Sequence, residues 1–380
     1  MKIAVEGTAF VRTPKTGVDY YCYELMSAAL RHDSKNQYNF VYFAPKNNSF
    51  DVNLPFDNVQ QTQITKLPVK VYNALLRTPF APAIDKLASV SSDIFFFPNF
   101  IRWPVSRSKK TVTLVYDTSY LDYPQATKTA IHRWYLSWAV PQSIRRSDAI
   151  IAISESTKQS IMRHYGTPPE KISVITPAVD HKLFKPTTKQ AIAKVKEKFG
   201  ITENYFLFLG TLEPRKNVIG VVTAYLQLPT KIRTTHQLVL AGAKGWYGDE
   251  LEALIQQAAP NEIIRPGYIE TPEMPALYSG ATAFVFPSFF EGWGMPLVEA
   301  MACGTPVITA DNSSLPEVVA DSGLLVPTGD NKALSAAMQQ VASDHKLHKQ
   351  LARRSLERAQ QFSWDKGGQQ LVELFQRLQP

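Results

Sequence analysis

Residues 283–306 read AFVFPSFFEGWGMPLVEAMACGTP, a pattern typical of a buried strand, a glycine-bearing turn and a short helix. The first four residues are apolar, Gly292 and Gly294 lie in the turn, and Pro296 stands where a helix can begin. Glycines let main-chain N–H groups approach a ligand, and a helix N-terminus adds about half a positive charge, so the turn suits a phosphate group. A tight turn without a ligand is the alternative interpretation.

Two carboxylates flank this turn. Glu291 comes directly before the glycines, and we expect Glu299 in the first turn of the helix. Because they are eight residues apart across a turn, they do not form an acid and base pair on one helix face. We interpret them as separate contacts on one extended ligand, with Glu299 accepting hydrogen bonds from ribose hydroxyls and Glu291 facing the part beyond the phosphates.

Glu291 and Glu299, with Gly-Trp-Gly-Met at 292–295 between them, resemble the signature of the family 4 retaining glycosyltransferases, which have the GT-B fold. The resemblance implies that a nucleoside-diphosphate sugar binds here. It also implies that Glu291 is catalytic and that donor contacts come from Gly292, Trp293, Gly294, Met295 and Glu299.

Short apolar runs alternate with amphipathic stretches along the whole chain, which predicts an α/β protein with parallel sheets covered by helices on both faces. In the first half, strands are expected at 3–5, 38–43, 94–97, 112–115, 149–153 and 172–175. In the second half, they are expected at 205–209, 238–240, 263–264 with 269, 283–286, 307–308 and 324–326. Two such series predict two doubly wound, Rossmann-like domains facing a cleft, which is the GT-B arrangement.

The domain boundary is expected near 180–188, where the periodicity is lost. Residues 1–185 would form an acceptor-binding domain and residues 186–363 a nucleotide-sugar-binding domain. Residues 364–380 read as a C-terminal helix, and in GT-B enzymes such a tail commonly crosses back to the first domain.

A second donor-binding element is expected in GTLEPRKN at 210–217, which follows the first strand of the second half. Arg215 and Lys216 could hold two phosphates by charge-assisted hydrogen bonds that strengthen as the leaving group gains charge. The element resembles the Arg-Lys diphosphate clamp of the family, although such a pair is often only a solvated surface feature. By the same resemblance, Tyr268 and Ile269 would contact the nucleobase, while the glycine turn at 242–245 has no assigned chemistry.

The first half contributes residues to the acceptor and sugar side. Asp117 follows the strand at 112–115, and the resemblance makes it catalytic, with Tyr116 in place of the usual histidine. Asn99 lies in a partial match to a His-x-Pro-Asn element. Gly17 either approaches the donor phosphates or caps a helix, and Ser154 is expected to cap the helix that follows it.

The formal net charge of +8 is unevenly distributed, because basic residues exceed acidic ones by ten in 1–190, whereas acidic residues exceed basic ones by two in 191–380. The first half therefore suits an anionic acceptor, such as a polyprenyl diphosphate, or an anionic membrane. The basic and aromatic segment 66–110 is one candidate for such a contact, with an ordinary solvated surface as the alternative. No nucleic-acid partner is expected, because the basic residues are scattered.

No signal peptide or spanning helix is expected in the sequence. Cys22 and Cys303 lack metal-ligand spacing and are expected to be buried thiols in a reducing compartment. The predicted location is therefore cytoplasmic, with the inner face of the cell membrane as a further option. Neither a metal ion nor a cofactor is expected, since no Asp-x-Asp motif or histidine cluster occurs.

The predicted function is transfer of a hexose, with retention of configuration, from a nucleotide sugar to a glycan or lipid-linked acceptor in polysaccharide synthesis. The pattern looks most like bacterial mannosyltransferases, which makes GDP-mannose the first expectation, with UDP-glucose and UDP-N-acetylglucosamine still open. The alternatives are a nucleotide-sugar 2-epimerase on the same fold and a non-catalytic nucleotide-sugar-binding protein.

Overall fold

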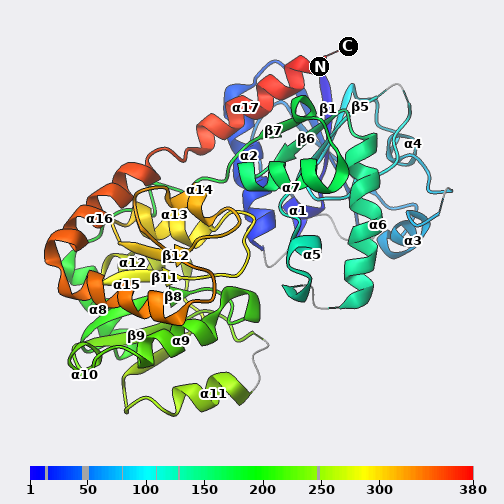
Figure 1. Ribbon diagram of the computed structural model, residues 1–380. Helices are drawn as coiled ribbons and strands as arrows, with labels where there is room; N and C mark the ends of the chain where they lie inside the picture. Colours follow the sequence, from blue (N-terminus) through cyan, green and yellow to red (C-terminus); the bar gives the residue numbers. More distant parts are fainter. Residues whose placement is uncertain are drawn as a thin grey trace. The chain divides into compact units, whose positions relative to one another are not determined.

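The computed structural model describes residues 1–12, 16–44, 51–78, 80–107, 109–126, 129–245 and 249–379. The chain divides into two compact units (Figure 1). Unit 1 comprises Met1–Asp122, Thr127–Pro177 and Trp364–Pro380, and unit 2 comprises Tyr123–Ala126 and Ala178–Ser363. The division falls after Pro177, whereas the first domain was expected to end at residue 185.

Unit 1 is built on a seven-stranded sheet in the order β3-β2-β1-β4-β5-β6-β7, with every neighbouring pair parallel. The strands are β1 (Lys2–Glu6), β2 (Gln37–Phe43), β3 (Val59–Ile64), β4 (Ile94–Phe97), β5 (Lys110–Val115), β6 (Ala149–Ala152) and β7 (Ile172–Val174). Six of them coincide with the predicted apolar runs. The sequence analysis missed β3, because this edge strand carries Gln-Gln-Thr-Gln at its centre and buries few of its side chains.

Two helices of unit 1, α2 and α7, begin at polar side-chain caps. Thr16 and Asp19 form a reciprocal capping box at the start of α2, so Thr16, and not Gly17, is the N-cap. The Ser154 hydroxyl accepts a hydrogen bond from the Thr157 N–H and caps α7, as predicted. The helices are α1 (Thr8–Val11), α2 (Gly17–His32), α3 (Val69–Leu75), α4 (Ile84–Ala88), α5 (Ser119–Asp122), α6 (Ala130–Arg146), α7 (Glu155–Tyr165) and α17 (Trp364–Arg377), with a 3-10 turn η2 (Pro169–Lys171).

The C-terminal helix α17 belongs to unit 1, where it packs along α2 (Figure 1). Gly368 lies against the main chain of α2, and a Cβ there would come within 2.5 Å of the Ala28 carbonyl carbon. At the start of α17, the Trp364 ring makes an edge contact with Tyr21 at 5.6 Å. A glycine at the crossing thus lets the two helices approach closely.

Unit 2 has a six-stranded parallel sheet in the order β10-β9-β8-β11-β12-β13. The strands are β8 (Asn204–Leu209), β9 (His236–Ala241), β10 (Ile263–Gly267), β11 (Ala283–Phe286), β12 (Val307–Ala310) and β13 (Leu324–Val326), and all six lie where they were predicted. Because the chain builds outward from β8 in one direction and then returns to its other side with β11, the strand order reverses between β8 and β11. The carboxyl ends of strands at such a reversal are the usual place for a ligand.

The helices of unit 2 are α8 (Lys189–Phe199), α9 (Val218–Leu226), α10 (Thr230–Arg233), α11 (Asp249–Ile255), α12 (Met274–Ser279), α13 (Met295–Ala302), α14 (Leu315–Val319), α15 (Asn331–Ser343) and α16 (His345–Ala359). Three 3-10 turns, η1 (Pro124–Ala126), η3 (Pro214–Lys216) and η4 (Thr271–Glu273), complete the unit. Across the described residues of both units, no helix combines the length and the apolar character needed to cross a bilayer.

The close approach of α17 to α2 gives a test with a matched pair of glycines. Alanine normally stabilises a helix relative to glycine by roughly 0.5–1 kcal/mol. Gly367→Ala should show this gain, because its Cβ would be 3.4 Å from its nearest neighbour, an ordinary contact. Gly368→Ala should instead lower the free energy of unfolding by about 1–3 kcal/mol, because its Cβ meets main-chain atoms that cannot move aside. Urea unfolding of both variants measures the difference, and equal stability would contradict the packing.

Candidate functional site

The glycine turn of unit 2 joins β11 to α13. Gly294 has a φ of +108°, a left-handed conformation that favours glycine, and it directly precedes the first residue of α13, Met295. Glu299 is consequently the fifth residue of the helix and lies beyond its first turn. The sequence analysis was wrong on this point, because it placed the start of the helix at Pro296.

Two serines that the sequence analysis did not single out hold this turn. The Ser313 hydroxyl accepts a hydrogen bond from the Glu291 N–H at 3.0 Å. The Ser314 hydroxyl donates to the carbonyls of Glu291 at 3.0 Å and Trp293 at 2.8 Å. Both serines follow β12, so their position just after a predicted strand was the signal that could have found them.

Four charged side chains meet beside the turn, and we call Glu213, Arg215, Lys216 and Glu291 the ion cluster. The Glu291 carboxylate pairs with Arg215 Nη1 at 2.7 Å and with Lys216 Nζ at 2.6 Å. Arg215 also donates to Glu213 Oε1 from Nε at 3.0 Å and from Nη2 at 2.7 Å. The structure thus brings the predicted clamp and the predicted Glu291 together, and it adds Glu213, which the sequence analysis had not assigned.

Main-chain contacts tie the clamp to the glycine turn. The Phe289 N–H donates to the Arg215 carbonyl at 2.8 Å, and Arg215 Nη1 donates to the Phe290 carbonyl at 2.8 Å. Lys216 Nζ lies 4.5 Å from the centre of the Phe286 ring, at the end of β11. Residues that are about 75 positions apart in the sequence therefore form one rigid group.

The ion cluster is largely buried, with the side chains of Glu291 and Lys216 only 10% and 12% exposed. Burial on its own raises the pKa of the Glu291 carboxyl, but the charges of Arg215 and Lys216 outweigh burial and lower this pKa to about 2. Burial lowers the pKa of the Lys216 ammonium, and the charge of Glu291 opposes that decrease. Glu291 is therefore ionised at neutral pH, and each cation has a carboxylate partner.

Glu299 lies in a different electrostatic environment. The Tyr278 hydroxyl on α12 donates to its Oε2 at 2.9 Å, and Tyr278 was not among the predicted site residues. Burial raises the pKa of Glu299 to about 7, and the hydrogen bond from Tyr278 opposes this rise. Protonated and ionised forms of Glu299 are thus both present near neutral pH.

A pocket of about 350 Å³ opens at the carboxyl ends of β8, β9 and β10. It is lined by Leu212, Leu240, Gly242, Lys244, Gly245, Leu251, Glu252, Arg265 and Gly267. A side chain at Gly242 would overlap the main chain of Gly210, and one at Gly245 would overlap that of Leu212. The glycine turn at 242–245, to which the sequence analysis assigned no chemistry, is thus part of a pocket wall that requires glycine.

The predicted nucleobase contacts adjoin this pocket through Gly267. The side chain of Tyr268 is 64% exposed, whereas that of Ile269 is buried in the core. Trp293, predicted as a donor contact, is also buried and makes an edge contact with Phe362 at 5.3 Å. Because their side chains are buried, Ile269 and Trp293 could contact a ligand only through main-chain atoms.

The predicted residues of unit 1 form a separate set. The Tyr116 hydroxyl is buried, donates to the Pro98 carbonyl at 2.7 Å and lies 2.9 Å from Cys22 Sγ, and burial raises the pKa of Tyr116. The partly buried Asp117 accepts a hydrogen bond from the Ser119 N–H at 2.9 Å. Asn99 is also partly buried, and Gly17 starts α2 with open space around its Cα. Tyr116 thus has its hydrogen-bonding partners within unit 1.

Comparisons with known proteins agree with the fold. The family model "Glycosyltransferase Family 4" matches residues 16–183, and the model "Glycosyl transferases group 1" matches residues 189–358. Together with two doubly wound parallel sheets, these matches define a glycosyltransferase with the GT-B fold. The chain belongs to the family 4 glycosyltransferases, which are retaining hexosyltransferases.

Individual relatives support this assignment. O-antigen chain mannosyltransferase B of Escherichia coli is 33% identical over 287 residues, which cover 75% of this chain and 74% of that protein. The serotype-specific mannosyltransferase WbdA of Escherichia coli is 28% identical over 239 residues, but these cover 61% of this chain and only 29% of WbdA. The crystal structure of Anabaena HepE in complex with UDP has a TM-score of 0.72 at 18% identity and covers 99% of both chains.

The lowered pKa of Glu291 predicts how acid affects stability. A carboxyl whose pKa falls from the usual 4.5 to about 2 on folding stabilises the protein above pH 4.5, and this contribution is lost as the pH falls toward 2. Glu291→Gln should lower the free energy of unfolding at pH 6 by about 3–5 kcal/mol, because it leaves the buried Lys216 without its carboxylate partner and leaves Arg215 with Glu213 alone. The variant should also lose less stability on acidification. Urea unfolding between pH 3 and pH 6 measures both effects.

Glu357→Gln is the matched control, because Glu357 forms an exposed ion pair with Arg353 on α16. Its effect should stay below about 1 kcal/mol at every pH, as is usual for surface pairs. Parallel pH profiles for the wild type and Glu291→Gln would contradict the assigned ion cluster.

Proposed function

We propose that the protein transfers mannose from GDP-mannose, with retention of configuration, to a glycan or polyprenyl-diphosphate-linked acceptor in cell-surface polysaccharide synthesis. The ion cluster beside the glycine turn is the observation that carries the proposal, since it positions two cations and an acid at the edge of the sheet where a nucleotide sugar would bind. The relation to O-antigen chain mannosyltransferase B supports mannose as the sugar. HepE was crystallised with UDP, but at 18% identity this likeness concerns the fold alone.

Donor binding would exchange the partners of the two cations. Without a ligand, Arg215 and Lys216 are neutralised by Glu213 and Glu291. An incoming diphosphate would share these cations with the carboxylates, and main-chain N–H groups of 292–295 would add further donors. The contacts between the two cations and the diphosphate would strengthen as the sugar departs and the diphosphate gains negative charge. Contacts that are stronger in the transition state than in the ground state lower the activation free energy of the transfer.

The transfer step follows from this arrangement. The bond between the anomeric carbon and the diphosphate oxygen breaks, and the acceptor oxygen forms a new bond to the same carbon on the same face. The acceptor proton passes to the departing phosphate oxygen, so the step needs neither a metal ion nor a separate base. Asp117 and Glu291 would orient the acceptor and the sugar and would stabilise the developing positive charge.

Unit 1 would supply the acceptor side in this proposal, with Asp117, Asn99 and Tyr116 as its contributors. The excess of basic residues in 1–190 suits an anionic acceptor and a site of action in the cytoplasm at the inner face of the cell membrane. Because the chain is a family 4 glycosyltransferase, we do not retain the epimerase and the non-catalytic protein as alternatives.

The clamp is tested by removing its charges. Arg215→Gln with Lys216→Gln should lower turnover of GDP-mannose by roughly a hundredfold or more, because two stabilising contacts to the leaving group are lost. Release of GDP and UDP from their mannose, glucose and N-acetylglucosamine conjugates, measured with an extract of lipid-linked glycans, gives donor choice and turnover together. The wild type should use GDP-mannose in preference to the UDP sugars.

Arg265→Gln with Lys244→Gln is the control for charge, because it also removes two cations from unit 2 but leaves the ion cluster intact. It should change donor affinity more than turnover. Unchanged turnover in the clamp variant would reject the assigned chemistry, and preference for a UDP sugar would reject the assigned donor.

The raised pKa of the Glu299 carboxyl predicts that nucleotide binding depends on pH. The ionised carboxylate accepts hydrogen bonds from two ribose hydroxyls, whereas the protonated acid does so less well. Affinity for GDP should therefore rise as the pH increases through about 7, the pKa to which burial raises Glu299. Calorimetric titration between pH 6 and pH 8 measures this dependence.

The phosphate of the nucleotide also titrates in this pH range, and its titration affects binding to the wild type and to Glu299→Gln equally. Glu299→Gln is therefore the control that separates the titration of Glu299 from that of the phosphate. The variant should bind GDP more weakly and with a flatter pH profile. The same profile in the variant and the wild type would show that Glu299 does not contact the nucleotide.

A further inference from the structure

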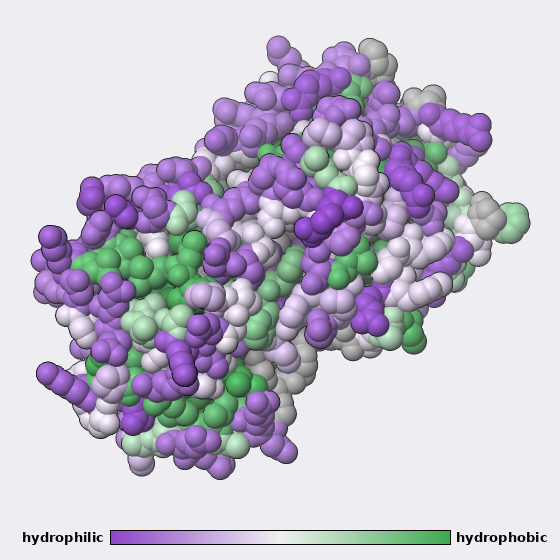
Figure 2. All heavy atoms as spheres, viewed as in Figure 1, coloured by the Kyte–Doolittle hydropathy of each residue, from purple (hydrophilic) through white to green (hydrophobic). Residues whose placement is uncertain are grey.

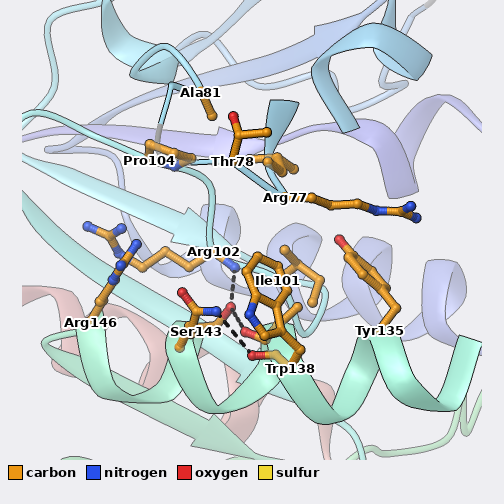
Figure 3. Close-up of a pocket in the computed structure, with 13 residues that line it drawn as sticks. Arg77, Thr78, Ala81, Ile101, Arg102, Pro104, Tyr135, Trp138, Ser143 and Arg146 are labelled. Atoms are coloured by element: carbon orange, nitrogen blue, oxygen red, sulfur yellow. Dashed lines mark hydrogen bonds between the residues drawn. The ribbon is translucent and has the colours of Figure 1, made fainter. Parts of the chain in front are cut away.

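Unit 1 contains a pocket of about 390 Å³ that none of the predicted site residues lines. One wall of the pocket is formed by α6 (Figure 3). The other wall is formed by residues 76–78 and 81, which follow α3, and by residues 101, 102 and 104, which follow β4. Its polar lining consists of Arg77, Thr78, Arg102, Tyr135, Gln142, Ser143 and Arg146, and its apolar lining consists of Leu76, Ala81, Ile101, Pro104, Trp138 and Ala139.

Three arginines give the pocket its charge. Arg102 and Arg146 lie at one end, and Arg77 lies at the other beside Tyr135, with its guanidinium carbon 5.1 Å from the ring centre (Figure 3). Within the part of the chain that the structure describes, none of the three forms an ion pair with a carboxylate. Nearby acids have other partners, because Asp148 pairs with Lys110 at 3.1 Å and Asp85 accepts from Ser106.

Arg102 is held in place before any ligand arrives. Its N–H donates to the Ser143 hydroxyl at 2.9 Å, and its Nε donates to the Thr111 hydroxyl at 3.3 Å. Burial, followed by the positive charge of Arg146, lowers the pKa of Arg102. An anion bound between these two guanidinium groups would relieve their repulsion and gain charge-assisted hydrogen bonds.

Large exposed apolar side chains stand next to lining residues in the sequence or one turn before them on α6. Ile131, Trp134 and Trp138 are spaced by three and four residues, so they share one face of α6. Trp138 lines the pocket, whereas Ile131 and Trp134 are 76% and 65% exposed. Phe80, which stands between the lining residues Thr78 and Ala81, is 82% exposed.

This part of unit 1 differs from an ordinary solvated face. Figure 2 shows green side chains near α6 and beside α3, and it shows larger green patches over unit 2 as well. Val69 and Val71 on α3 are exposed as well. Tryptophan and phenylalanine side chains of this kind favour the boundary between lipid headgroups and acyl chains.

We propose that the pocket binds the terminal phosphate of a membrane lipid, with Arg102 and Arg146 on the phosphate and Arg77 at the mouth. Phe80, Ile131 and Trp134 enter the interfacial layer of the membrane. A small soluble phosphate would satisfy the arginines but would leave these apolar side chains in water. The combination of unpaired cations with exposed aromatic residues therefore favours a lipid, and the site is separate from the donor-binding residues of unit 2.

The test measures co-sedimentation of the full chain with phosphatidylcholine vesicles that contain phosphatidic acid. Arg146→Gln and Arg77→Gln should each weaken binding roughly tenfold more than Arg145→Gln, because they remove charge-assisted hydrogen bonds as well as charge. Arg145 is the matched control, since it is also exposed, lies in the last turn of α6 and does not line the pocket. Trp134→Ser should also weaken binding and should leave folding intact, because Trp134 is largely exposed.

Further measurements separate the sources of phosphate. Binding to charge-matched phosphatidylserine vesicles should be weaker, and titration with inorganic phosphate or glycerol 3-phosphate should give lower affinity than the vesicles. Equal losses in Arg145→Gln and Arg146→Gln, or equal binding to phosphatidylserine, would indicate diffuse attraction and overturn the proposal. Tight binding of soluble phosphate with no effect of Trp134→Ser would overturn the lipid as ligand. GDP binding should be unchanged in all four variants.

Discussion

The arrangement of unit 2 depends on one buried carboxylate. Glu291 stands at the entrance of the glycine turn and pairs with both Arg215 and Lys216, which lie after a different strand. Isolated buried charges are costly, so each of these groups requires the others to be in place. The pairing therefore fixes the position of the turn relative to the end of β8, and Ser313 and Ser314 fix it from the side of β12.

The same pairing keeps two buried cations in a position that would suit the proposed diphosphate. Two exposed cations would hold a diphosphate through their charge alone, but buried cations need a partner when the ligand is absent. Glu213 and Glu291 supply that partner, and their carboxylates must share the cations once phosphates arrive. In the proposed function, binding would be an exchange of partners inside a preorganised group, which would keep the reorganisation at the moment of reaction small.

Unit 1 shows the opposite arrangement of charge. Its pocket along α6 contains three arginines that lack carboxylate partners among the described residues, and large apolar side chains of α6 and of the residues after α3 are exposed. The pocket is less buried than the ion cluster, so water can solvate the unpaired charges in the absence of a ligand.

The sequence by itself determined the two series of strands, the family, the glycine turn and the two cations of the clamp. These features are local, because the period of apolar residues and the spacing within a motif are set by a few neighbouring positions. Only the tertiary structure revealed that Glu291 neutralises the clamp, that Tyr278 contacts Glu299, and that α17 belongs to unit 1. It also revealed β3 and the arginine pocket. Each of these depends on residues far apart in the chain, and burial and ion pairing between such residues leave no periodic signal in the sequence.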